Sequence, residues 1–61
     1  MNKLRGYYRG FEGKEKRLYR ENVQKTMNWS KRTFENRVKN SVVLTDAENI
    51  IAELEYQKLK P

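Results

Sequence analysis

Cysteine and histidine are both absent from this chain of 61 residues. Their absence excludes disulfide bridges, zinc sites built from thiolate or imidazole ligands, a thiol nucleophile and an imidazole base. The length leaves room for one domain, whose small core supplies only about 3–5 kcal/mol of net stability without a further source. The acidic residues are scattered without a paired site. We therefore expect no enzyme, no catalytic or metal site, no cofactor and no small-molecule ligand.

Long apolar stretches are absent too, since no uninterrupted apolar run exceeds three residues. A membrane-spanning helix needs about 20 such residues. The first residues include Lys3 and Arg5 but no apolar segment of the kind that a secretory signal contains. We therefore expect a cytoplasmic protein that does not interact with membranes.

Positive charge is abundant and unevenly distributed. The whole chain has a formal net charge of +6 and an isoelectric point near 9.8. Residues 1–41 contain 12 Lys or Arg and 4 Asp or Glu, a net charge of +8, whereas residues 42–61 contain 2 and 4, a net charge of −2. A strongly basic region beside a mildly acidic one indicates a surface that faces a polyanion such as nucleic acid. A simple solubilising excess of charge is the alternative.

The pattern of apolar residues predicts an all-α fold, a compact three-helix bundle preceded by an N-terminal arm. All three glycines lie within residues 1–13, and glycine disfavours a helix, so this segment is expected to be a flexible arm or a short strand. Apolar residues at helical spacing predict a domain over residues 14–61, with helices at about 14–27, 31–40 and 46–58.

The boundaries between the predicted helices contain turn and capping residues. Asn28 tolerates the left-handed conformation of a tight turn, and Ser30 is a good N-cap for the helix that follows. Trp29 and Phe34 have the spacing of a hydrophobic staple, which fixes the angle at which the chain enters that helix. Residues Thr45–Glu48 read Thr-Asp-Ala-Glu and predict a capping box at the start of the last helix.

Two helices joined by a short turn, the second one mostly polar, predict a helix-turn-helix whose recognition helix, residues 30–40, enters the major groove of DNA. Within it, Arg32 could bind guanine and Asn36 could bind adenine, each through two hydrogen bonds. Glu35 repels phosphate, so it accepts a hydrogen bond from cytosine, pairs with Arg32 or Lys39, or lies off the DNA. The residues expected to contact DNA are Arg20, Lys25, Ser30, Lys31, Arg32, Thr33, Asn36, Arg37 and Lys39.

The segments Met27–Phe34, which reads MNWSKRTF, and Leu44–Ala52, which reads LTDAENIIA, resemble the small helix-turn-helix proteins of phages and mobile elements that are related to the Cro and repressor type. The resemblance covers about residues 18–55. It implies a transcription regulator that binds DNA, usually as a dimer. Gln24 departs from the small residue, and Asn28 from the turn glycine, that such motifs usually have. The residues to which the resemblance assigns base reading are Ser30, Lys31, Arg32, Thr33 and Asn36.

The N-terminal arm has more than one interpretation. Its cations Lys3, Arg5 and Arg9 are expected to contact the minor groove beside the site, as flexible basic arms do. A mixture of arginine, glycine and aromatic residues also suits RNA binding, in which rings stack on bases. Alternatively, the aromatic residues of the arm fold back over the small core.

The last predicted helix has two apolar stripes. The main stripe, which is expected to face the core, consists of Ala47, Ile50, Ile51 and Leu54. The second stripe, which is predicted to contact a partner, consists of Ala52, Tyr56 and Leu59. Either the aromatic residues of the arm cover the second stripe or a second copy of the chain does. A two-fold homodimer would present two recognition helices about 34–36 Å apart.

Three functions are compatible with these patterns. The favoured one is a sequence-specific double-stranded DNA-binding protein, a repressor-like transcription regulator. A small phage-type interaction protein would instead bind another protein through the N-terminal arm and the last helix. An RNA-binding protein is the third, and it depends on the arm and the charge.

Overall fold

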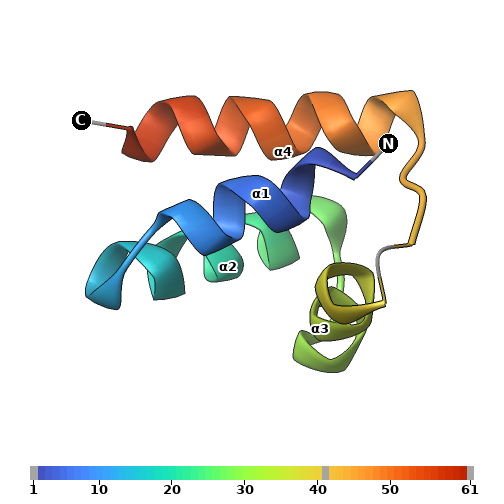
Figure 1. Cartoon of the computed structure of the whole chain (residues 1–61), viewed down its shortest axis with the longest axis horizontal. Helices are drawn as coiled ribbons and strands as arrows, with labels where there is room; N and C mark the ends of the chain where they lie inside the picture. Colours follow the sequence, from blue (N-terminus) through green and yellow to red (C-terminus); the bar gives the residue numbers. More distant parts are fainter. Residues whose placement is uncertain (1, 41, 61) are drawn as a thin grey trace.

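The computed structural model describes residues 2–40 and 42–60, which form four helices (Figure 1). The helices are α1 (Lys3–Gly10), α2 (Gly13–Met27), α3 (Lys31–Lys39) and α4 (Asp46–Leu59). The predicted all-α class is confirmed, and α2, α3 and α4 begin and end within one residue of their predicted bounds. The bundle has four helices, however, where three were predicted, and the described residues contain no strand. Nor is any helix in these ranges long and apolar enough for a membrane span.

The segment predicted as a flexible or short-strand arm is helix α1. Leu4 is fully buried, and Tyr7 and Tyr8 pack against the core. Phe11, directly after the helix, is buried as well. These positions have the spacing of an amphipathic helix, and the two glycines inside α1 are exposed. Burial of the apolar side therefore offsets the roughly 1 kcal/mol that each glycine costs relative to alanine in a helix.

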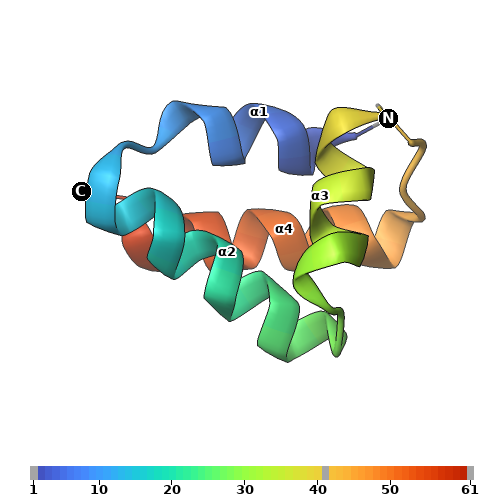
Figure 2. The same ribbon diagram turned by 90° about the horizontal axis from the view of Figure 1, so that it is seen from below.

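The four helices are arranged so that α3 and α4 lie on opposite sides of the molecule. α1 packs against all three other helices, and α3 packs against α1 and α2 but not against α4. Figure 1 shows α4 along one side and α3, seen nearly end-on, on the other. Figure 2 shows α1, α2 and α3 together on the face that lies away from α4. The buried hydrophobic residues of the core are Leu4, Phe11, Tyr19, Val23, Phe34, Val38, Leu44 and Ala52.

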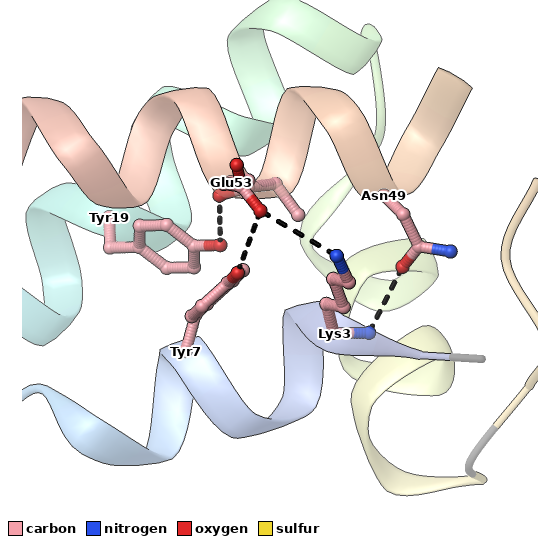
Figure 3. A network of polar contacts seen from close by, with 6 residues as sticks. Lys3, Tyr7, Tyr19, Asn49 and Glu53 are labelled. Carbon is pink, nitrogen blue, oxygen red and sulfur yellow. Dashed lines mark hydrogen bonds and ion pairs between the residues drawn. The ribbon is translucent and has the colours of Figure 1, made fainter. Parts of the chain in front are cut away.

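Polar contacts fasten α1 to α4 (Figure 3). The Lys3 amide donates to the Asn49 side chain at 3.0 Å, and the Lys3 ammonium forms an ion pair with Glu53 at 3.6 Å. The Tyr7 hydroxyl donates to Glu53 at 3.2 Å, and the Tyr7 ring stacks on Tyr56 with the ring centroids 4.3 Å apart. Loss of hydration, and then the Glu53 carboxylate, raise the pKa of Tyr7. Lys3, which was expected to contact DNA, is thus held against α4.

The two faces of α4 are largely the reverse of those predicted, although Ile51 of the main stripe is half-buried. Ala52 is fully buried and is not available to a partner, while Tyr56 and Leu59 pack against the core. Ile50 and Leu54, predicted to face the core, are 59% and 56% exposed. The cause is the unpredicted α1, because the rings of Tyr7 on α1 and of Phe11 directly after it pack on Tyr56. Of the two alternatives for the second stripe, cover by the N-terminal aromatic residues is the one found in this chain.

Capping and a buried carboxylate fix α4 along its length. The predicted capping box is confirmed: the Glu48 amide donates to the Thr45 hydroxyl at 3.1 Å, and the Thr45 amide donates to the Glu48 carboxylate at 2.9 Å. Farther along, Glu55 is buried and accepts hydrogen bonds from the Thr26 hydroxyl at 3.1 Å and the Lys58 ammonium at 3.2 Å. The bond from Thr26 joins α4 to the end of α2, whereas Lys58 lies on α4 itself.

Substitutions on α4 test the assignment of its faces. Leu54→Gln is expected to change the free energy of unfolding by less than about 0.5 kcal/mol, because this side chain lies largely in solvent. Ala52→Leu is expected to destabilise the chain by about 1–3 kcal/mol, because its extra carbons must enter a close-packed core. Urea unfolding followed by circular dichroism measures both values. The opposite ranking of the two variants would mean that the stripe predicted from the sequence faces inward.

Candidate nucleic-acid interface

The turn between α2 and α3 consists of residues 28–30, and its geometry follows from Asn28. This residue has φ 58° and ψ 42°, so the predicted left-handed conformation is confirmed. It lets the Trp29 amide donate to the Gln24 carbonyl at 2.9 Å, while the Asn28 amide donates to the Lys25 carbonyl at 3.4 Å. These bonds satisfy carbonyls at the end of α2 and reverse the chain. α3 therefore runs across the direction of α2 (Figure 1).

Ser30 caps the N-terminus of α3, as predicted. Its side-chain oxygen accepts from the Thr33 amide at 3.2 Å, and its hydroxyl donates to the Thr33 hydroxyl at 3.1 Å. Both residues were expected to contact DNA. In the free chain both side chains are instead engaged in the cap, where they fix the first turn of α3.

Aromatic packing holds α3 against the core. Phe34 is fully buried and meets the Tyr8 ring edge to face, with the centroids 5.1 Å apart. Trp29 is half-buried against the cluster that contains Phe34 and Val38, which agrees with the predicted staple. The Arg37 guanidinium lies over the Trp29 ring, 5.5 Å from its centroid. Arg37, expected to bind phosphate, is therefore half-buried beside the indole.

The C-terminal end of α3 is held by Asn2, the residue that precedes α1. The side-chain amide of Asn2 donates to the Arg37 carbonyl at 2.7 Å and to the Val42 carbonyl at 2.8 Å. Its side-chain oxygen accepts from the Arg5 amide at 3.2 Å and so caps α1. The last carbonyls of a helix lack partners within that helix. One side chain thus joins the start of α1 to the end of α3 and to the segment that leads to α4.

α3 turns its apolar side inward and leaves the opposite face exposed. Arg32, Asn36 and Lys39 lie on that exposed face in successive turns. Their side chains form no hydrogen bond or ion pair with any residue that the structure describes. Glu35 is exposed as well and, within the same ranges, pairs with neither Arg32 nor Lys39. Two interpretations of Glu35 are left: it accepts from cytosine or lies off the DNA.

The other cations predicted to contact DNA have different surroundings. In the last turn of α2, Lys25 is exposed, whereas the Arg20 side chain is only 20% exposed and lies 3.8 Å from the Glu21 carboxylate. The buried Nε of Arg20 has no hydrogen-bond partner among the described residues. On α1, Arg9 is exposed and Arg5 is half-buried. Arg20 is therefore less accessible to a ligand than the exposed Lys25 and Arg9.

Two residues of this region have no clear signal in the sequence. Lys16 holds its ammonium 4.9 Å from the centroid of the Tyr8 ring, which in turn packs on Phe34 of α3. Asn2 contacts carbonyls that lie 35 and 40 positions away along the chain. The helical spacing of the apolar residues in α1 would have placed Asn2 at an N-cap. Its second role, at the end of α3, follows only from the packing of the two helices.

Neither a metal site nor a comparison with known proteins adds a constraint on this interface. The described residues contain no cluster of side chains suited to hold a metal ion. Comparison of the chain with protein-family models, with curated proteins and with solved structures gives no match. The function is therefore argued from the geometry of α3 and its surroundings.

Proposed function

We propose that the protein binds double-stranded DNA in a sequence-specific manner, reads the major groove with α3 and regulates transcription. The observation that carries this proposal is the pair Arg32 and Asn36, exposed one helical turn apart on a helix that is held at both ends. Arginine can donate two hydrogen bonds to guanine, and asparagine can form two with adenine. A helix that presents both side chains can therefore read neighbouring base pairs in a groove about 12 Å wide.

The distribution of charge supports binding of α3 to DNA. Lys31 and Lys39 are exposed at the two ends of α3, and Lys25 is exposed in the last turn of α2. Cations that flank a reading helix suit the phosphates on either side of the groove. Half of the acidic residues of the chain lie on α4, on the side of the molecule away from α3 (Figure 1). The negative charge of α4 is thus kept at a distance from the phosphates.

The alternative functions have less support in this geometry. Binding of RNA was expected to use the N-terminal arm and the charge, and binding of another protein the arm and the last helix. The aromatic rings of the arm pack against the core and α4. The stripe expected to contact a second copy is also packed within the chain. A homodimer would therefore need a surface other than this stripe.

Selection from random duplex DNA tests the proposal. The wild-type chain is expected to enrich a short preferred site. Arg32→Ala and Asn36→Ala are each expected to relax the preference at one position of that site, at a cost of about 1–3 kcal/mol in discrimination against the wrong base, because each removes a two-hydrogen-bond contact. Sequencing of the selected pools measures the preference, and circular dichroism verifies that each variant is folded.

A matched control is Arg17→Ala, which removes an exposed arginine from α2 roughly 15 Å before the end of that helix. This variant is expected to select the same site as the wild-type chain. Failure of the wild-type chain to enrich any site would overturn the proposal. Enrichment of a site that neither α3 substitution alters would leave DNA binding in place but remove α3 as the reading helix.

A further inference from the structure

We propose that Asn2 is a positioning residue for base reading, a role that rests on the proposed function. Its side-chain amide sets the tilt of α3 and thereby the base pairs that the second half of α3 reaches. Asn2 lies outside α3 and belongs to the start of α1. The specificity of the protein would then depend on a residue that touches no base.

The hydrogen bonds of Asn2 support this role because they use both ends of one amide. The nitrogen donates to the Arg37 and Val42 carbonyls at 2.7 and 2.8 Å, and the oxygen accepts from the Arg5 amide at 3.2 Å. Asparagine is the residue type that offers two donors and one acceptor on a side chain this short. Aspartate and serine retain the acceptor that caps α1, but neither can supply both donors.

The attachment of α3 explains why its last turn needs this contact. The cap and the turn hold its first residues, the buried Phe34 holds its middle, and the buried Val38 packs in its last turn, where Asn2 adds hydrogen bonds to the backbone. The last turn includes Arg37, Val38 and Lys39, and Val38 is its buried side chain. With Asn2 in place, this turn is fixed to α1, which itself packs against α4. A reading helix must be held to within about 0.5 Å for its side chains to meet base edges.

Two substitutions separate the two roles of Asn2. Its nitrogen bonds the Arg37 and Val42 carbonyls, which we call the clamp on α3, and its oxygen caps α1. Asn2→Ser keeps a capping oxygen and the charge of the chain but is too short to bond both carbonyls. Asn2→Asp is as good an N-cap as asparagine but presents a carboxylate to two carbonyl oxygens. If the cap on α1 were what mattered, the aspartate variant would behave like the wild-type chain. If the clamp matters, base reading by the aspartate variant is impaired at least as strongly as base reading by the serine variant.

The experiment is selection from random duplex DNA with the wild-type chain, both Asn2 variants and Asn22→Asp. This last variant makes the same change of charge on α2, at a half-buried asparagine. Both Asn2 variants are expected to lose affinity for the wild-type site by roughly ten-fold, about the effect of one hydrogen bond. They are also expected to relax the base preference on the Asn36 side of the site while retaining it on the Arg32 side. Asn22→Asp is expected to keep the whole preference.

The outcomes distinguish this role from the proposed function. If the wild-type chain enriches a site and both Asn2 variants keep its full preference, Asn2 has no positioning role, although α3 still reads DNA. If the wild-type chain enriches no site, the proposed function itself is overturned. In that case hydrogen exchange of the last amides of α3 still decides whether the clamp exists, because its loss is expected to speed exchange there in both variants. Unchanged exchange would overturn the clamp as well.

Discussion

Deletion of residues 1–12 is expected to unfold the chain, although the sequence predicts residues 1–13 to be an arm whose cations contact DNA. The deletion removes two buried side chains, Leu4 and Phe11, and the rings of Tyr7 and Tyr8 that pack beside them. Loss of one buried Leu or Phe side chain costs about 2–5 kcal/mol, and a core of this size supplies only about 3–5 kcal/mol. Far-ultraviolet circular dichroism and thermal melting are expected to show little helix and no cooperative transition.

Point substitutions act as controls for this deletion, because they keep the chain length. Leu4→Ala is expected to destabilise the chain by about 2–5 kcal/mol, since it leaves a cavity among the four helices. Arg9→Ala, on the exposed side of α1, is expected to change the stability by less than about 0.5 kcal/mol. A truncated chain that melts cooperatively near the temperature of the full chain would restore the arm interpretation.

The pattern of Leu4, Tyr7, Tyr8 and Phe11 shows why α1 was missed. The spacing of an amphipathic helix is present in the sequence, but two glycines lie within it. Because glycine has a low helix propensity, the sequence favoured an arm. A helix of eight residues is not stable alone in water. Its existence depends on partners on α4 that lie more than 40 positions away, such as Glu53, which accepts a hydrogen bond from Tyr7. No local rule contains that information.

The reversed faces of α4 follow from the same omission. With three helices, the stripe of Ala47, Ile50, Ile51 and Leu54 is the natural choice for the core, because no predicted helix is left to cover Tyr56. With α1 present, aromatic rings cover Tyr56, and the smaller Ala52 lets the helices approach closely. Which of two apolar stripes is buried is thus decided by the other helices and not by the stripe itself.

The junction between α2 and α3 was predicted well because its determinants are local. The left-handed conformation of Asn28 and the cap of Ser30 on Thr33 involve residues at most a few positions apart. The exposure of Arg32 and Asn36 follows from helical periodicity once the buried stripe is known. Burial of other predicted DNA contacts, and the contact of Asn2 with α3, depend instead on long-range packing and could not be read from spacing.

A second large effect is expected at alkaline pH, and it depends on Tyr19. This side chain is fully buried, and its hydroxyl donates to the Ala52 carbonyl at 2.8 Å (Figure 3). Burial, and then the neighbouring Tyr7 and Glu55, raise the pKa of Tyr19 far above its ordinary value of 10.0. The phenol therefore stays protonated in the folded chain at a pH at which it ionises in the unfolded chain.

The direction of the effect follows from linkage between protonation and folding. Because the folded chain holds this proton more tightly, the contribution of Tyr19 to stability is fully present below about pH 10 and is lost as the pH rises above that value. Ionisation of one group can change the free energy of unfolding by up to about 1.4 kcal/mol per pH unit. Two units above pH 10 are therefore expected to remove up to about 2.8 kcal/mol, at least half of the roughly 3–5 kcal/mol available to so small a core. Urea unfolding from about pH 8 to about pH 12 measures the decline.

Tyr19→Phe isolates this contribution from that of the other ionisable groups. At neutral pH the variant is expected to be less stable by about 0.5–1.5 kcal/mol, because the Ala52 carbonyl loses its donor. Above about pH 10 its stability is expected to fall less steeply than that of the wild-type chain, since one proton fewer is released on unfolding. The lysines and the other tyrosines are common to both chains, so their ionisation largely cancels in the difference between the two slopes, apart from the coupling of Tyr7 to Tyr19. Equal slopes would mean that the fold does not resist ionisation at position 19, and that the buried hydroxyl is reached by solvent before the chain unfolds.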